Sequence, residues 1–139
     1  MPGETDQVKW RGVRPIYGIR GVWPAIDAVR VEAWKSAVGV AIETIYTVPA
    51  NKKLFIASCF ISSRLSANAA CYGQVIVTDS GAVVKVYPYI HEYEIAGQMA
   101  TGMYYMPALE AEAGWLVKVK SSHADLIATG IIHGWLEDA

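Results

Sequence analysis

Charged side chains are scarce in this chain of 139 residues: Asp, Glu, Lys and Arg make up 18%, whereas hydrophobic residues make up 53%. The formal net charge is −1, so the composition lacks the excess of basic residues that is typical of nucleic-acid binding. The sequence also has no apolar run of the roughly 18 residues that a membrane-spanning helix needs. With neither nucleic acid nor membrane expected as a partner, a core or a subunit interface has to cover the excess apolar surface.

Motifs for covalent, phosphate or metal chemistry are missing as well. The glycines are isolated, so there is no phosphate-binding loop, and no serine stands in a nucleophile elbow. The densest group of possible metal ligands is His91, Glu92 and Glu94, but a cupin motif needs a second histidine one residue away from the first. We therefore predict a protein that is not an enzyme and needs no metal or cofactor, and keep a cupin-like enzyme only as a third hypothesis.

There are only two cysteines, Cys59 and Cys71. If residues 54–64 and 70–79 form a hairpin, Cys59 does not lie opposite Cys71, so we expect two free, partly buried thiols, as in a protein made in a reducing cytoplasm. Residues 1–20 contain no apolar stretch of the kind found in secretory signals, and no signal peptide is expected.

Short apolar stretches separated by turn-forming residues fill positions 37–139. Asp79-Ser80-Gly81 predicts a hairpin turn, Asn51 suits a left-handed backbone, and Gly130 and Gly134 suggest a bulge or a close backbone approach. Strands of this length and spacing, without helical periodicity, predict an all-β domain: one β-sandwich of jelly-roll type with about eight strands. The predicted strands cover residues 37–48, 53–64, 70–79, 82–88, 92–95, 102–107, 115–120 and 126–136.

Residues 1–36 have a different character. They hold six basic residues against four acidic ones, a net charge of +2, whereas residues 37–139 carry −3. Because glycines and prolines interrupt large aromatic side chains, we predict an irregular N-terminal arm that lies across another subunit; wrapping around its own domain is the alternative. Ala25–Trp34 is compatible with a short helix or a strand. The candidate interaction residues of the arm are Trp10, Trp23, Trp34, Arg11, Arg14 and Arg20.

Tyrosines gather between residues 87 and 105, at Tyr87, Tyr89, Tyr93, Tyr104 and Tyr105, and the first three stand next to glutamates and a histidine. Exposed tyrosines stack well on sugars, so these three are a possible ligand platform. The alternative is that they fill the edge of the sandwich and a subunit interface.

Thr47–Leu54, with the sequence TVPANKKL, resembles the first hairpin of small β-sandwich structural proteins of tailed bacteriophages. Tyr104–Pro107, Gly114–Val119 and Ile127–Gly134 resemble their closing strands, so the resemblance spans about residues 42–136. It implies a jelly-roll protein that decorates capsids or forms parts of tails and fibres, commonly as a trimer, and it carries no catalytic residues.

Together, these observations predict a non-enzymatic virion protein made in the host cytoplasm, most consistent with a capsid decoration or cement protein. Its expected partners are copies of itself, as a homotrimer, and the major capsid protein or another virion protein. The alternative is a carbohydrate- or receptor-binding module of a tail or fibre, for which a glycan would be the ligand.

Overall fold

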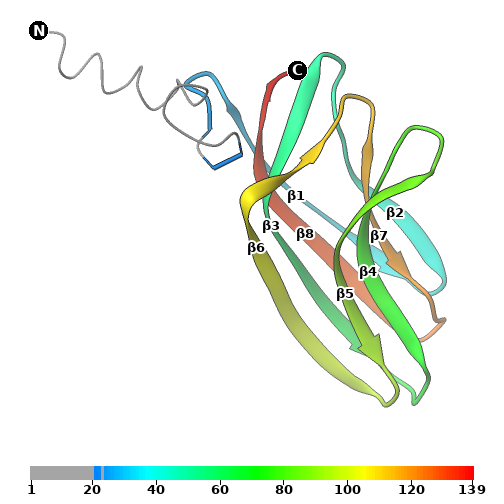
Figure 1. The fold of residues 1–139 in the computed structure, drawn as a ribbon. Coiled ribbons are helices and arrows are strands. Elements are labelled where there is room, and N and C mark those ends of the chain that lie inside the picture. Colours follow the sequence, from blue (N-terminus) through cyan, green and yellow to red (C-terminus); the bar gives the residue numbers. More distant parts are fainter. Residues whose placement is uncertain (1–20, 23) are drawn as a thin grey trace, which may run out of the picture.

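The computed structural model describes residues 21–22 and 24–139, which form two four-stranded antiparallel sheets packed against each other (Figure 1). The predicted all-β sandwich is confirmed, and none of the described residues forms a helix that is long and apolar enough to cross a membrane. The strands are β1 (Val29–Val38), β2 (Ala41–Thr47), β3 (Lys52–Leu65), β4 (Cys71–Thr78), β5 (Val84–Tyr93), β6 (Gly97–Ala111), β7 (Leu116–Ser121) and β8 (Leu126–Asp138).

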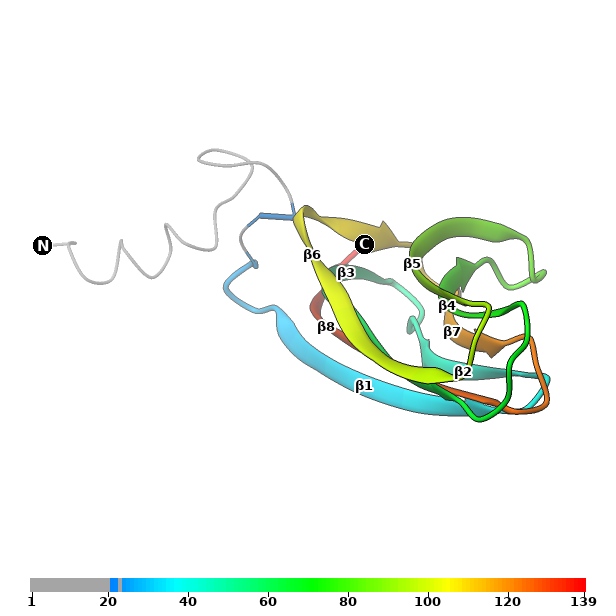
Figure 2. The ribbon, with the colours of Figure 1, turned by 90° about the horizontal axis from the view of Figure 1, so that it is seen from below.

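The strands pair in a nested pattern. One sheet has the order β1-β8-β3-β6 and the other β2-β7-β4-β5. Thus β4 pairs with β5, β3 with β6, β2 with β7 and β1 with β8, as in one long hairpin that has been rolled into two layers (Figure 2). This is the jelly-roll arrangement that the strand pattern predicts.

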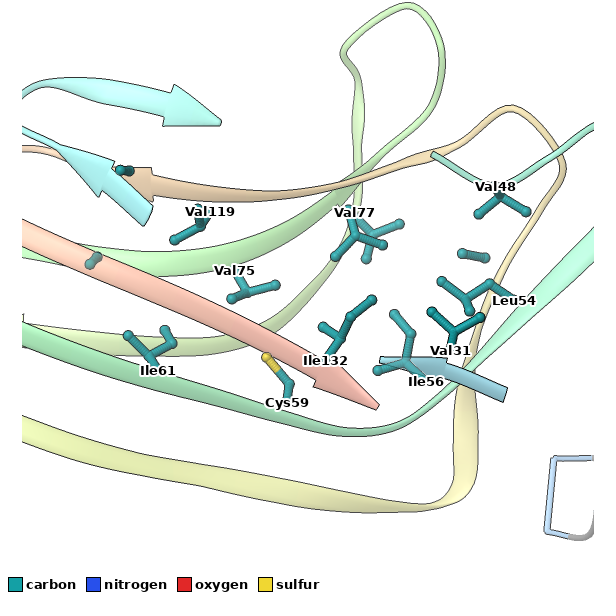
Figure 3. Close-up of a cluster of buried hydrophobic side chains, with 14 of the residues drawn as sticks. Val31, Val48, Leu54, Ile56, Cys59, Ile61, Val75, Val77, Val119 and Ile132 are labelled. Atoms are coloured by element: carbon teal, nitrogen blue, oxygen red, sulfur yellow. The ribbon is translucent and has the colours of Figure 1, made fainter. Parts of the chain in front are cut away.

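β-Branched side chains from both sheets fill the space between the layers (Figure 3). Val75 and Val119 of one sheet and Ile132 of the other are fully buried there. Val117 and Val119 are buried, and the half-buried Lys118 and Lys120 alternate with them, which confirms the strand predicted at 115–120.

Two turns form as the sequence predicts. Asn51 adopts a φ of 62° between β2 and β3. Asp79 closes the hairpin between β4 and β5, because its Oδ1 accepts hydrogen bonds from the backbone N–H groups of Gly81 and Val83 at 2.8 and 3.0 Å. These hydrogen bonds, together with nearby Lys85, lower the pKa of Asp79.

The first strand begins earlier than predicted. Residues 37–48 are not one strand: β1 ends at Val38 and β2 starts at Ala41 in the other sheet. Val29–Ser36, which the prediction assigned to the arm, pair with β8. The segment is therefore a strand from Val29 onward, and its pairing with β8 places Val31 in the buried core.

Bulges explain why β5 and β6 are longer than the short strands predicted at 82–88, 92–95 and 102–107. The register with β4 shifts between Tyr89 and Val86, and Pro88 lies in that bulge. The register with β3 shifts between Leu109 and Tyr104, which places Tyr105 and Pro107 in a bulge of β6. A bulge tolerates a proline that a regular ladder does not, so the strands continue past it.

The predicted hairpin between residues 54–64 and 70–79 is wrong. β3 lies between β8 and β6 in one sheet, and β4 lies between β7 and β5 in the other. Both edges of β3 are already occupied by longer strands, so β4 pairs elsewhere. The conclusion about the thiols still holds: Cys59 and Cys71 are free and buried.

Close packing at two glycines of β8 confirms the expectation for Gly130 and Gly134. A Cβ added at Gly130 would lie 2.9 Å from side-chain atoms of Ile45 and Val75 in the opposite sheet. At Gly134, where Ala57 bulges out of β3, an added Cβ would lie 1.8 Å from the carbonyl oxygen of Phe55.

We therefore expect Gly134→Ala to lower the free energy of unfolding by about 1–3 kcal/mol or more, because the backbone of β3 would have to move. Gly97→Ala is the control, since a Cβ there would meet no atom within 4 Å. Urea unfolding of both variants checks this. Equal stability of the two variants would show that the bulge adapts freely.

Candidate functional site

The outer face of the first sheet, meaning the side turned away from the second sheet, exposes apolar side chains. The register aligns Trp34 of β1 with Ile131 of β8, and Ile131 with Phe60 of β3, in one row across the sheet. Tyr104 of β6 packs edge-on against the Phe60 ring, with centroids 5.5 Å apart. Trp34 is 68% exposed and Tyr104 78% exposed, so the row is open to solvent at both ends.

A second apolar area lies at the end of this face that is nearer the β1–β2 connection. Val38 and Ile127 face each other across β1 and β8, and both are exposed. An open hollow of about 600 Å³ adjoins Ile127 over β3, β6 and β8. Its lining residues are Ser62, Ser63, Arg64, Gln98, Met99, Ala100, Ile127 and Thr129.

Polar side chains on either side of the Trp34–Ile131–Phe60 row are bonded to one another. Ser36 and Thr129 lie 2.6 Å apart through their hydroxyl oxygens. The Ser58 hydroxyl lies 3.3 Å from His133 Nδ1, and His133 Nε2 lies 3.6 Å from a carboxylate oxygen of Glu32. The face therefore combines several paired polar groups with apolar side chains that are exposed in the part of the chain that the structure describes.

Residues 21–22 and 24–28 lie over the opposite end of the same face. The backbone N–H of Ala25 donates to Glu137 Oε2 in β8 at 3.0 Å, and the indole N–H of Trp135 donates to the same oxygen at 2.6 Å. Further back along the chain, the carbonyl of Gly21 accepts a hydrogen bond of 2.9 Å from the backbone N–H of Ala108 in β6. The described start of the chain thus packs against its own sheet.

Phe55 lies beneath this crossing. Its neighbours Leu54 and Ile56 point into the core, so Phe55 points to the outer face, yet it is 0% exposed. Its ring stacks on Trp135 with centroids 5.4 Å apart. Where the crossing ends, the apolar row of Trp34 and Tyr104 is left exposed.

Of the predicted interaction residues, the structure places only Trp34, as an exposed side chain of the outer face. The others, namely Trp10, Trp23, Arg11, Arg14 and Arg20, lie outside the described residues. Sequence reasoning missed Phe60 and Ile131, whereas Tyr104 was among the tyrosines considered for a ligand or subunit contact. A signal was present in β3, where Leu54–Ile56 and Cys59–Ile61 are apolar at consecutive positions; this indicates that neither face of the strand is fully solvated.

The three tyrosines do not form a shared exposed platform, which corrects that interpretation. Tyr87 is 68% exposed, but Tyr93 is 7% exposed and points between the sheets. Tyr89 is half-buried, and its hydroxyl donates to Thr101 Oγ1 at 3.0 Å. In a regular strand these three tyrosines would point to the same face, because successive side chains alternate between the two faces. The bulge at Pro88 breaks this alternation, so Tyr87 points away from Tyr89 and Tyr93.

Tyr89 and Tyr93 instead end a chain of hydrogen bonds inside the sandwich. Ser63 Oγ lies 2.6 Å from the Tyr93 hydroxyl and 2.8 Å from His91 Nδ1. His91 Nε2 lies 2.5 Å from Thr101 Oγ1, which Tyr89 also reaches. Every polar atom of the imidazole is therefore bonded to a hydroxyl, and His91 acts as a cross-link between β3, β5 and β6.

His91 is 3% exposed, whereas Glu92 and Glu94 next to it in sequence are exposed. The three side chains do not converge, and no group of three or more possible metal ligands occurs in the part of the chain that the structure describes. Burial lowers the pKa of His91, so the neutral imidazole is the form that this site stabilises.

This burial predicts acid sensitivity. In the unfolded chain His91 binds a proton at the ordinary histidine pKa, whereas in the folded chain its lowered pKa resists protonation. The contribution of His91 to stability is therefore complete above about pH 6.5 and is lost as the pH falls below that value. His91→Gln should cost about 1–3 kcal/mol at neutral pH through broken hydrogen bonds and should make stability less dependent on pH in the acid range. Urea unfolding near pH 7.5 and near pH 5 checks this.

The control for that experiment is His123→Gln, in the loop between β7 and β8, outside the hydrogen-bonded chain. It should retain the wild-type loss of stability in acid. If His91→Gln keeps the same loss, the acid sensitivity belongs to other groups.

The buried thiols add no reactive centre. Cys59 lies between the sheets at 0% exposure, and desolvation raises its pKa to about 12. Burial also raises the pKa of Cys71. Thiols of this kind remain protonated and are poor nucleophiles.

No family model matches the sequence, and no curated protein matches it. Among solved structures, the chain is similar to a protein of the acidic stable capsid of Helicobacter pylori bacteriophage KHP30, with 9% identity and a TM-score of 0.44 over 80% of this chain and 93% of that chain. It is also similar to a chain of the cyanophage Pam1 capsid asymmetric unit, with 12% identity, a TM-score of 0.41 and coverage of 77% and 85%. A third is the carbohydrate-binding module CBM36 in complex with calcium and xylotriose, with 12% identity, a TM-score of 0.35 and coverage of 80% and 99%. Phage capsid proteins are thus among the structures that this chain is similar to, at identities too low to assign a function.

Proposed function

We propose that this chain is a non-enzymatic structural protein of a phage virion, and specifically a capsid decoration or cement protein. In this role it assembles as a homotrimer and binds the major capsid protein or another virion protein. The phage-like sequence pattern of residues 42–136 and the jelly-roll topology of the described residues support this proposal.

The observation that carries the proposal is the outer face of the first sheet. Trp34, Val38 and Tyr104 are each more than 60% exposed on one face of a rigid sandwich. Contiguous exposed apolar surface on a soluble domain marks an interaction site, and aromatic anchors dominate the energy of such sites. The exposed side chains at the ends of the row are apolar or aromatic, and such a surface suits assembly with another protein better than chemistry.

The direct test is the protein content of the particle. Mass spectrometry of virions purified through two density gradients should find peptides of this chain at a constant ratio to the major capsid protein. A lysate protein that is abundant but not packaged serves as the control for carry-over. Virions that lack the chain would refute the proposal.

Assembly gives an independent expectation. Light scattering of the full chain at micromolar concentration should give a molar mass three times the 15.1 kDa of one chain. Closed cyclic assembly covers apolar surface without growing into a filament. A stable mass of 15.1 kDa would exclude the trimer, and a mass that rises continuously with concentration would indicate open association.

A further inference from the structure

We propose that the outer face of the first sheet is the docking site for residues 1–20 of a second copy of this chain. This inference rests on the proposed assembly into a homo-oligomer, and it adds the receiving surface and the identity of the segment that occupies it.

The first argument is where the described chain leaves the sheet. From β1 at one edge, residues 24–28 pass over β8, where the N–H of Ala25 donates a hydrogen bond to Glu137, and residues 21–22 lie at β6 on the far edge, where Gly21 accepts one from Ala108. The chain has then crossed the full width of its own face. To reach Trp34 of the same copy, the preceding residues would have to turn back across the sheet, whereas continuing in the same direction leads to a neighbour.

The second argument is reach. Twenty extended residues span at most about 70 Å, and a strand of ten residues such as β1 is about 33 Å long. The segment before Gly21 is therefore long enough to leave one sandwich and cover the exposed part of the next.

The third argument is complementary chemistry. Residues 1–20 contain the large apolar side chains Trp10, Ile16, Tyr17 and Ile19, together with Arg11, Arg14 and Arg20. The receiving face offers aromatic rings and aliphatic side chains, on which tryptophan and arginine both pack well. The hollow of about 600 Å³ beside Ile127 can accept a large side chain at the end of the face that the crossing residues leave open.

The test uses the full chain with the photo-cross-linker benzoylphenylalanine in place of Tyr104. Unlabelled protein carrying the cross-linker is mixed with ¹⁵N-labelled protein, irradiated, digested and sequenced by mass spectrometry. We expect cross-links from position 104 to peptides within residues 1–20 of the ¹⁵N-labelled copy. Benzoylphenylalanine in place of Tyr87, which is 68% exposed in the other sheet, is the control and should not link to this segment.

Serine variants test the energetic role of the face. Trp34→Ser and Tyr104→Ser should each weaken the oligomer at least tenfold in light-scattering dilution series, while Tyr87→Ser, at the same 68% exposure as Trp34, should leave it unchanged. Equal effects of Trp34→Ser and Tyr87→Ser would overturn the inference.

The cross-linking outcomes separate the alternatives. If position 104 links to residues 1–20 of the unlabelled protein only, the segment wraps its own sheet. If position 104 links to β strands of the labelled copy, two sheet faces contact each other directly. Either result, or an absence of links, overturns the docking inference. Virions that still contain the chain would then leave the proposed function standing.

Discussion

Each strand of the sandwich is held by a partner from the opposite half of the chain, and this antiparallel pairing about the β4–β5 turn is the constraint on which the structure depends. Asp79 fixes the turn because its carboxylate accepts hydrogen bonds from two backbone N–H groups. From there the pairs β3–β6, β2–β7 and β1–β8 follow in order, and the rolling of this ladder into two sheets brings β3 against β8 and β4 against β7. The hydrophobic core between the two sheets is a consequence of this arrangement.

The same roll determines which surface remains available for interactions. β3 and β8 occupy the middle of the first sheet, so their outward side chains form the centre of a broad face instead of an edge. Several polar groups of that face are paired with each other, Ser36 with Thr129 and Ser58 with His133. What remains for a partner is mainly apolar contact, which favours a tight, extended interface over recognition of a small polar ligand.

Much of the fold could be predicted from local signals. Alternation in Trp115–Lys120, the Asp79-Ser80-Gly81 turn and the two glycines of β8 each led to the correct local structure, and together they indicated a sandwich. The pairing of β3 could not be predicted this way, because partners far apart in sequence leave no local signal and the nearest strand is the natural first choice.

The site was harder to predict for a related reason. Trp34 was identified as an interface candidate, but its partners across the sheet, Ile131 and Phe60, became neighbours only through the register of three strands. Tyr93 looked available because it stands among polar residues in the sequence, yet the strand turns it inward to Ser63. The face that a residue occupies depends on bulges, because each bulge shifts the alternation of side chains. Pro88 suggested the end of a strand, whereas β5 continues past it through a bulge.

The pairing of β1 with β8 has a consequence for synthesis. Val29 pairs with Leu136, and β8 is the only strand of the sheet that hydrogen-bonds to β1. During translation, β1 and the β8-facing edge of β3 therefore have no sheet partner there until the ribosome has added the final strand. Pairings of such long sequence separation form late and slowly, and an unpaired apolar edge is prone to contact with other nascent chains. The interval between the emergence of β1 and the completion of β8 is therefore when association through these unpaired edges is most favoured.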